Sequence, residues 1–232
     1  MDRALTLYRT TIGKKAVMAA SGVVLFGYVV GHLAGNLKLY QGPEAINSYA
    51  AFLRSVPALL WGTRVLLLLS FGAHIAAAVQ LWLRNRGARP TRYRSRKDLA
   101  TNYAARTMYW SGPILALFVL YHLAHLTLGW VPGDYEFDPS NVYNNVVYGF
   151  RVWWISAIYI VGQLALGLHL FHGVWAMFGS VGWTHPKYNA WRRHLAVAAA
   201  VLITAGNLSF PIAVMAGWVE PTTEHFFYPE LG

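Results

Sequence analysis

Five long stretches without a charged residue divide the chain, and the charged residues gather in the segments between them. A helix needs about 20 apolar residues to cross the hydrocarbon core of a bilayer. The uncharged runs cover 16–37, 65–83, 107–133, 152–186 and 195–219. The pattern therefore predicts an all-α integral membrane protein with a bundle of five transmembrane helices, over about 16–38, 58–84, 106–130, 151–178 and 194–218.

The connections between these helices indicate one further element. Residues 44–56 follow a Gln-Gly-Pro turn at 41–43, and we predict a short helix there that lies on the membrane surface. A Pro-Gly turn at 132–133 leads into an acidic loop, and the tail 219–232 has little sign of structure. No internal repeat occurs, so we expect residues 1–232 to form a single membrane domain.

The composition supports a membrane protein and excludes several kinds of chemistry. Of the 232 residues, 56% are hydrophobic and 12% are charged, unlike an ordinary soluble domain. The absence of cysteine excludes disulfides, thiol catalysis and cysteine-ligated iron–sulfur clusters within the chain. No phosphate-binding loop or dinucleotide fingerprint occurs. The first hydrophobic run is about twice as long as the core of a signal peptide, so we expect it to remain as a helix.

The charges are unequally divided between the two ends of the predicted helices. Lys and Arg number 4 in residues 1–15, 8 in 84–106 and 3 in 179–194, against 4 in the opposite segments. Most acidic residues lie in those opposite segments. Because basic loops stay in the cytoplasm, we predict a cytoplasmic N-terminus and an outside C-terminus. Topology and anionic lipid headgroups account for the net charge of +10, so we expect no nucleic acid partner.

Four of the apolar segments carry one central histidine each: His32, His74, His122 and His169. A histidine inside a membrane is costly, so it indicates a functional site. Counted from the cytoplasmic helix ends, His32 and His122 lie at depths of roughly 21 and 24 Å. His74 and His169 lie at depths of roughly 15 and 14 Å. The depths therefore predict an outer pair, His32 with His122, and an inner pair, His74 with His169.

Two neighbouring histidines compete for these positions. His125 and His172 each follow a predicted pair member by about one helical turn, on nearly the same face. Their depths would be roughly 28 and 9 Å, which match the presumed partners less well. We therefore favour His122 over His125 and His169 over His172.

Two facing imidazoles can bind the iron of one haem, so two pairs predict two haems. A bis-histidine iron has no open position, which favours electron transfer over oxygen chemistry. Small residues beside the histidines would leave room for the flat macrocycle, and the sequence has them at Gly27, Gly31, Gly35, Gly167 and Gly173. The same glycines are equally typical of close helix packing in membranes.

Several short motifs accompany the histidines: Ser21-Gly22, Gly31-His32, the lone His74, Gly112 with His122 ten residues later, and His169-x-x-x-Gly173-x-Trp175. With the five-helix topology, they resemble one family over nearly the whole chain. This family is the single-subunit, di-haem cytochrome b anchor of succinate:quinone oxidoreductase and fumarate reductase. The resemblance implies that His32 and His122 are iron ligands of an outer, distal haem b. It makes His74 and His169 the ligands of an inner, proximal haem b.

The resemblance also implies partners. A flavoprotein and an iron–sulfur protein would bind the cytoplasmic face of the inner membrane, through segments near 1–15, 84–106 and 179–194. Electrons from succinate, a tricarboxylic acid cycle intermediate, would pass through them to a quinone, with menaquinone suggested by the di-haem type. In a fumarate reductase the flow reverses, and the whole complex could be an oligomer. This chain has neither a flavin fingerprint nor a cysteine, so alone it cannot oxidise succinate.

Quinone reduction requires a hydrogen-bond donor at the carbonyl oxygens and a proton route. Candidate contacts for the quinone or for haem propionates are Lys15, Ser21, Gly31 and Arg106. Some di-haem members carry a membrane glutamate two residues before the fourth ligand, where this chain has Gly167. We therefore do not expect a transmembrane proton path of that kind.

Two other assignments stay open. The chain could be the cytochrome b subunit of another respiratory enzyme, such as a hydrogenase, formate dehydrogenase or nitrate reductase, although those usually place paired ligands on fewer helices. It could also be a metal-handling membrane transporter, because His122-x-x-His125 and His169-x-x-His172 each put two imidazoles on one helix face. A metal site of that kind leaves the other two histidines unexplained and has no membrane carboxylate to assist it.

Overall fold

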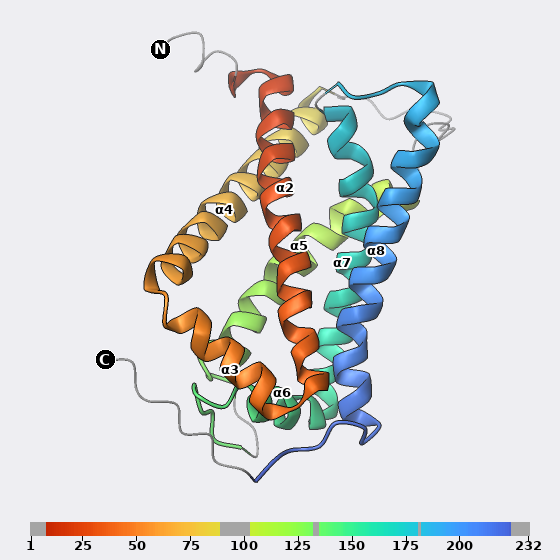
Figure 1. Ribbon diagram of the computed structural model, residues 1–232. Coiled ribbons are helices and arrows are strands. Elements are labelled where there is room, and N and C mark those ends of the chain that lie inside the picture. Colours follow the sequence, from red (N-terminus) through yellow and green to blue (C-terminus); the bar gives the residue numbers. More distant parts are fainter. Residues whose placement is uncertain (1–7, 89–102, 132–134, 181, 224–232) are drawn as a thin grey trace.

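The computed structural model describes residues 8–88, 103–131, 135–180 and 182–223. Five long helices connect its two ends: α2 (Thr11–Asn36), α4 (Pro57–Gly87), α5 (Tyr103–Leu126), α7 (Trp153–Ser180) and α8 (Pro186–Met215) (Figure 1). All five are long and apolar enough to span a membrane. The described residues form no strand. The predicted all-α class is thus confirmed, and so are five helices that are long and apolar enough to span a membrane.

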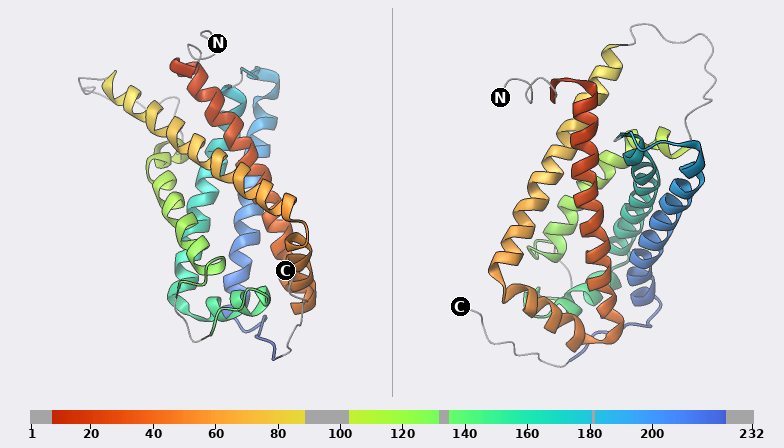
Figure 2. Two further views of the ribbon diagram at one scale, coloured as in Figure 1. Left: turned by 90° about the vertical axis from the view of Figure 1, so that its left-hand side faces the viewer. Right: turned by 45° about the horizontal axis from the view of Figure 1, so that its top comes forward.

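The helices pack in two groups. α7 packs between α5 and α8, while α2 packs mainly against α4 and also touches α7 and α8. Figure 2 shows α4 crossing α2 obliquely, with α7 and α8 running side by side behind them. Leu68, Leu69, Leu117 and Leu202 point outward from this bundle with 67–72% of their surface exposed. Exposed leucines of this kind are typical of helices whose outer faces contact lipid.

Two short helices lie across the end of the bundle opposite the N-terminus (Figure 1). α3 (Pro43–Arg54) follows a short 3-10 helix, η1 (Leu37–Gln41), and confirms the helix predicted at 44–56. α6 (Val142–Arg151) was not predicted, because its segment was assigned to an acidic loop. It is capped by Asn141, whose side chain accepts a hydrogen bond from the Asn144 backbone. Apolar positions three and four residues apart in this segment are the signal that could have indicated it.

The last helix begins earlier than predicted. The sequence placed its start near residue 194 because Lys187, Arg192 and Arg193 interrupt the apolar pattern. In the structure α8 begins at Pro186, a residue that suits the first turn of a helix. His185 caps this end by accepting a hydrogen bond from the Lys187 backbone. The helix therefore extends beyond its apolar part.

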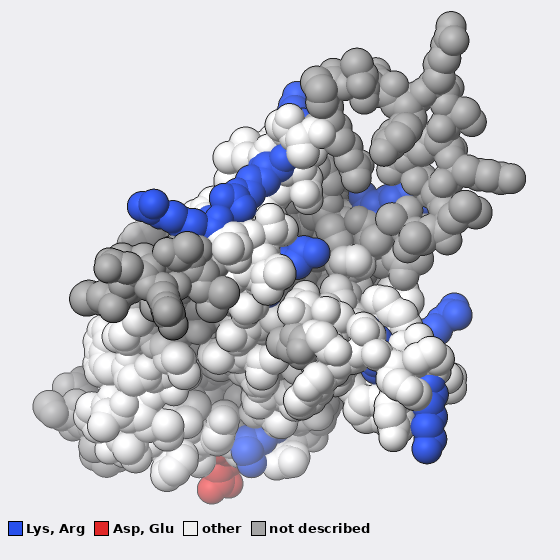
Figure 3. All heavy atoms as spheres, turned by 90° about the horizontal axis from the view of Figure 1, so that it is seen from above, with Lys and Arg blue, Asp and Glu red and all other residues white. Residues whose placement is uncertain are grey.

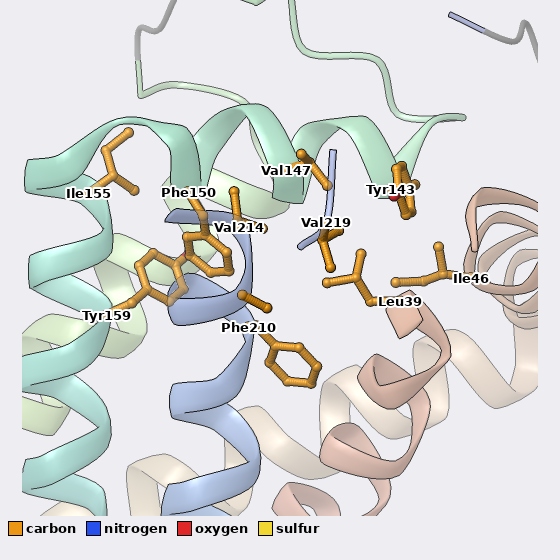
Figure 4. Close-up of a cluster of buried hydrophobic side chains, with 11 residues drawn as sticks. Leu39, Ile46, Tyr143, Val147, Phe150, Ile155, Tyr159, Phe210, Val214 and Val219 are labelled. Atoms are coloured by element: carbon orange, nitrogen blue, oxygen red, sulfur yellow. The ribbon is translucent and has the colours of Figure 1, made fainter. Parts of the chain in front are cut away.

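The tightest packing lies at the end that holds α3 and α6. Figure 4 shows buried apolar side chains from η1, α3, α6, α7 and α8 that meet there, with Val147 fully buried. Asn47 of α3 donates a hydrogen bond to Asn141 at 3.2 Å and accepts one from the Tyr143 backbone at 3.0 Å. These bonds join α3 to the start of α6, so the short helices close this end of the bundle.

The two ends differ in charge. Figure 3 looks onto the end that holds the start of α2, where Lys and Arg side chains are spread and acidic ones are scarce. The described basic residues at this end are Arg9, Lys14, Lys15, Arg84, Arg86, Arg106, Lys187, Arg192 and Arg193. Much of the predicted partner-binding surface, 1–7 and 89–102, lies outside the described residues. The cytoplasmic orientation of the basic end stays a prediction from charge.

Candidate functional site

The structure brings the four central histidines together in the two predicted pairs. His32 of α2 faces His122 of α5, with ring centres 5.8 Å apart. His74 of α4 faces His169 of α7, with ring centres 6.1 Å apart. Each pair thus joins a helix of the α2–α4 group to a helix of the α5–α7–α8 group. Four different helices are needed to form the two sites.

The pairs lie at two levels along the bundle. Ser21 of α2 contacts His74 of the inner pair, and His32 of the outer pair follows eleven residues later. Eleven residues of helix correspond to about 16 Å. On α7, Tyr159 contacts the outer His122 and precedes the inner His169 by ten residues, which gives about 15 Å. Two helices therefore give the same separation.

The inner pair is held by the backbone of α2. The His74 Nδ1 lies 3.1 Å from the Met18 carbonyl oxygen and 3.2 Å from the Ser21 hydroxyl. A carbonyl oxygen can only accept, so Nδ1 carries the hydrogen and the lone pair lies on Nε2. The Ser21 hydroxyl itself donates to the Val17 carbonyl at 2.7 Å. His74 is therefore fixed in the tautomer that can bind a metal through Nε2.

The second member of the inner pair has no such support. The Nδ1 of His169 is buried without a hydrogen-bond partner among the described residues, and so is the Nδ1 of His172 one turn later. A buried imidazole nitrogen without a partner costs free energy. A bound group would offset that cost only by reaching Nδ1 itself.

The outer pair is held by side chains. The Tyr159 hydroxyl lies 3.3 Å from Nδ1 of His122 and 2.9 Å from Nδ1 of His125. His32 stacks on Tyr28, with ring centres 5.4 Å apart and planes at 15°. The structure thus separates the two competing histidines: His122 faces His32, whereas His125 is buried against Tyr159 and Gly149.

The glycines near the histidines fall into two classes. A methyl group added at Gly27, Gly31 or Gly173 would meet no atom within 4 Å. In contrast, one added at Gly35 would lie 2.7 Å from the Tyr49 ring, and one at Gly167 would lie 2.4 Å from the Thr204 hydroxyl. Gly35 and Gly167 thus fit the interpretation of close helix packing. Gly27, Gly31 and Gly173 fit the interpretation of free space beside the histidines.

The other predicted contact residues differ in position. Ser21 is buried at the inner pair, whereas Lys15 and Arg106 are exposed at the basic end. The buried lysine is Lys14, which donates to the Gln80 side chain and lies 4.4 Å from the Tyr8 ring centre. Lys14 precedes Ser21 by seven residues, and this helical spacing is the signal that could have indicated it.

A second buried cation was missed by the sequence reasoning. Arg192 of α8 is 5% exposed, bonds the Trp175 carbonyl and Asn189 at 3.0 Å each, and lies 4.6 Å from the Trp175 ring centre. Its Nε has no hydrogen-bond partner, and no salt bridge joins Arg192 or Lys14 to a carboxylate within the part of the chain that the structure describes. Buried cations of this kind favour an anionic partner.

The geometry does not gather the histidines into a compact metal site. Among the described residues, no group of three or more His, Cys, Asp or Glu side chains lies close enough to hold a metal ion. The two His-x-x-His turns lie at different levels, so they do not form the site that a metal transporter of the alternative kind would need. No family model, no curated protein and no solved structure matches this chain.

Proposed function

We propose that this chain is the di-haem cytochrome b membrane anchor of a succinate:quinone oxidoreductase. In this proposal His32 and His122 bind an outer haem b, while His74 and His169 bind an inner haem b. The observation that carries it is the formation of two facing imidazole pairs at two levels, each pair drawn from two helices.

The ring separations fit this assignment. An imidazole nitrogen lies about 2 Å from a metal that it binds, and the ring centre lies about 1 Å farther away. Two imidazoles that hold one metal between them would therefore have ring centres about 6 Å apart. The observed separations of 5.8 and 6.1 Å agree with this value.

The donor chemistry fits as well. A bis-histidine haem transfers electrons without binding oxygen or substrate at the iron. His74 presents a neutral Nε2 because its Nδ1 hydrogen is committed to the Met18 carbonyl. The free space beside Gly27, Gly31 and Gly173 would accommodate a flat ring near the histidines.

The buried cations at the basic end suggest which residues hold the propionates of an inner haem. Gln80, the partner of Lys14, follows His74 by six residues, and Trp175, the partner of Arg192, follows His169 by six. Gln80 and Trp175, which these cations contact, thus lie about 9 Å along α4 and α7 beyond the inner pair. We assign Lys14 and Arg192 to this role in place of Lys15 and Arg106, which are exposed.

The proposed partners follow from the same assignment. A flavoprotein and an iron–sulfur protein would bind the basic end, on the cytoplasmic side of the inner membrane, and exchange electrons with a quinone through the two haems. The anchor geometry serves both succinate oxidation and fumarate reduction, and it serves menaquinone or another quinone. Succinate oxidation itself needs both partners, because this chain has neither a flavin fingerprint nor a cysteine to bind an iron–sulfur cluster.

The test is purification of the chain with its native partners, followed by a pyridine haemochrome assay and a succinate-dependent quinone reduction assay. We expect two haems b per chain and quinone reduction by succinate. A properly assembled complex without haem would contradict the haem assignment. Two haems with a hydrogenase or formate dehydrogenase as the copurified partner would keep the haem sites and replace the succinate complex.

A further inference from the structure

One phenol lies between two imidazoles beside the outer pair. The Tyr159 hydroxyl is within hydrogen-bond distance of His122 and His125, at 3.3 and 2.9 Å. Tyr159 is 5% exposed and His125 is 6% exposed, so bulk water does not satisfy these polar groups. His125 takes no part in the facing pairs, although it lies about one turn from His122 and is buried. The facing pairs therefore do not account for the burial of His125 against Tyr159.

Counting hydrogens limits what the cluster can do. A phenol has one hydrogen to donate, and each neutral imidazole has one hydrogen, on either Nδ1 or Nε2. If Tyr159 donated to His122, the hydrogen of His122 would lie on Nε2, and that nitrogen could not bind a metal. If Tyr159 donates to His125, its oxygen can accept the Nδ1 hydrogen of His122, and the lone pair of His122 lies on Nε2.

We infer that His125 is a positioning residue for the outer metal ligand. It accepts the Tyr159 hydrogen at Nδ1, and Tyr159 in turn accepts the Nδ1 hydrogen of His122. This chain of bonds holds His122 in the tautomer that binds iron. The shorter contact, 2.9 Å, is the one between Tyr159 and His125, which agrees with this direction. The inference rests on the proposed function, because it gives His122 an iron to bind.

The surroundings keep His125 in place. Its Cε1 and Nε2 atoms lie against Gly149 of α6, where an added methyl group would come within 2.6 Å of both. The ring also borders a cavity of about 40 Å³ that is lined by Asn145 and the tyrosines at 135 and 148. A polar cavity of this size can hold water, which would accept the Nε2 hydrogen of His125. Gly149 thus confines the His125 ring on one side, and the cavity borders the ring on another.

The inner level supplies a natural control. His172 follows its pair member His169 with the same spacing of three residues. Its buried Nδ1 has no hydrogen-bond partner in the described residues, whereas His125 has Tyr159. His125 and His172 thus have the same spacing from a proposed ligand but differ in whether Nδ1 contacts a tyrosine hydroxyl.

The experiment compares the reduction potentials of the two haems in the purified complex of each variant. Hydrogen bonding to an axial histidine makes it a stronger ligand and favours ferric iron. We expect Tyr159→Phe to raise the equilibrium constant for reduction of the outer haem by two- to tenfold. This corresponds to a rise in its reduction potential of at most about 59 mV for one electron. His125→Leu should shift it in the same direction by less, because the Tyr159 oxygen remains but is no longer polarised.

Two further variants separate positioning from packing. His125→Asn places an acceptor oxygen near the position of Nδ1 and should restore the outer potential toward the unsubstituted value. His172→Leu should leave the outer haem unchanged. Loss of the outer haem alone from Tyr159→Phe would agree with the inference. Two haems with an unchanged outer potential in Tyr159→Phe, or loss of both haems from it, would overturn the inference. Absence of haem from the unsubstituted complex would overturn the proposed function instead.

Discussion

The two histidine levels are held by different kinds of groups. At the inner level the Nδ1 of His74 is bonded to a backbone carbonyl, that of Met18. At the outer level the Nδ1 of His122 is bonded to a side chain, that of Tyr159. A backbone carbonyl survives any substitution at its residue, whereas a phenol does not. The inner ligand is thus protected from mutation, and the outer ligand can be tuned by it.

Packing differs between the levels in the same sense. Tyr159 belongs to the dense apolar cluster under α3 and α6, where its ring centre lies 4.8 Å from that of Phe150 (Figure 4). Toward the opposite end, the buried cations Lys14 and Arg192 lie beyond the inner pair. Dense apolar packing therefore adjoins the outer site, whereas buried charge lies beyond the inner site. Substitutions should separate the two influences.

The largest expected effect is the loss of one haem from a single level. His122→Leu removes a ligand of the outer pair, so the haem content should fall from two to one per chain. His125→Leu should keep both haems, because His125 does not face His32. Pyridine haemochrome assays of the two purified complexes measure this difference. The matched inner variants, His169→Leu and His172→Leu, should show the same contrast.

The opposite result has a clear meaning. If His125→Leu loses the outer haem while His122→Leu retains it, the ligand is His125 and the observed pairing does not reflect the loaded protein. If neither variant loses haem, the outer pair does not hold haem.

The histidine pairing could be predicted from the sequence. The distribution of Lys and Arg between the loops predicted the direction of each helix, and the direction allowed the depth of each histidine to be counted. Depth is uncertain by several ångströms, about the spacing between His122 and His125, so the choice of His122 depended on its closer match to the depth of His32. It carries no information on contacts around a helix. The role of Tyr159 depends on how α7 crosses α5, and nothing near Tyr159 in the sequence marks that crossing.

Helix ends were predicted less well than helix positions. The rule that a span stops at a charge placed the start of α8 at the wrong residue, because Arg192 is buried against Trp175 and Phe178 and does not lie in a loop. The same rule selected Lys15 as a site residue where the structure buries Lys14. Adjacent positions on a helix differ by about 100° in direction, so a choice between neighbours needs the packing partners.

A smaller effect is expected from crowding the outer level. Gly149→Ala places a methyl group within 2.6 Å of the His125 ring, and overpacking of this kind costs about 1–3 kcal/mol. We expect a lower midpoint of thermal unfolding and a shifted outer potential. Gly62→Ala, on α4 with no atom within 4 Å of the added group, is the control for the general effect of alanine in a helix. Equal midpoints for both variants would show that α6 does not confine His125.

The smallest expected effect concerns the inner level and tests the contrast between backbone and side-chain support. Ser21→Ala removes the hydroxyl 3.2 Å from the His74 Nδ1 but leaves the Met18 carbonyl at 3.1 Å. Because that carbonyl still accepts the Nδ1 hydrogen, the inner haem should stay bound. The equilibrium constant for its reduction should change by less than about twofold, which is about 20 mV in reduction potential for one electron. Redox titration of Ser21→Ala beside Ser70→Ala, a buried serine one turn before His74, measures the shift. A change as large as that of the outer haem in Tyr159→Phe would mean that the hydroxyl, and not the backbone, holds the inner ligand.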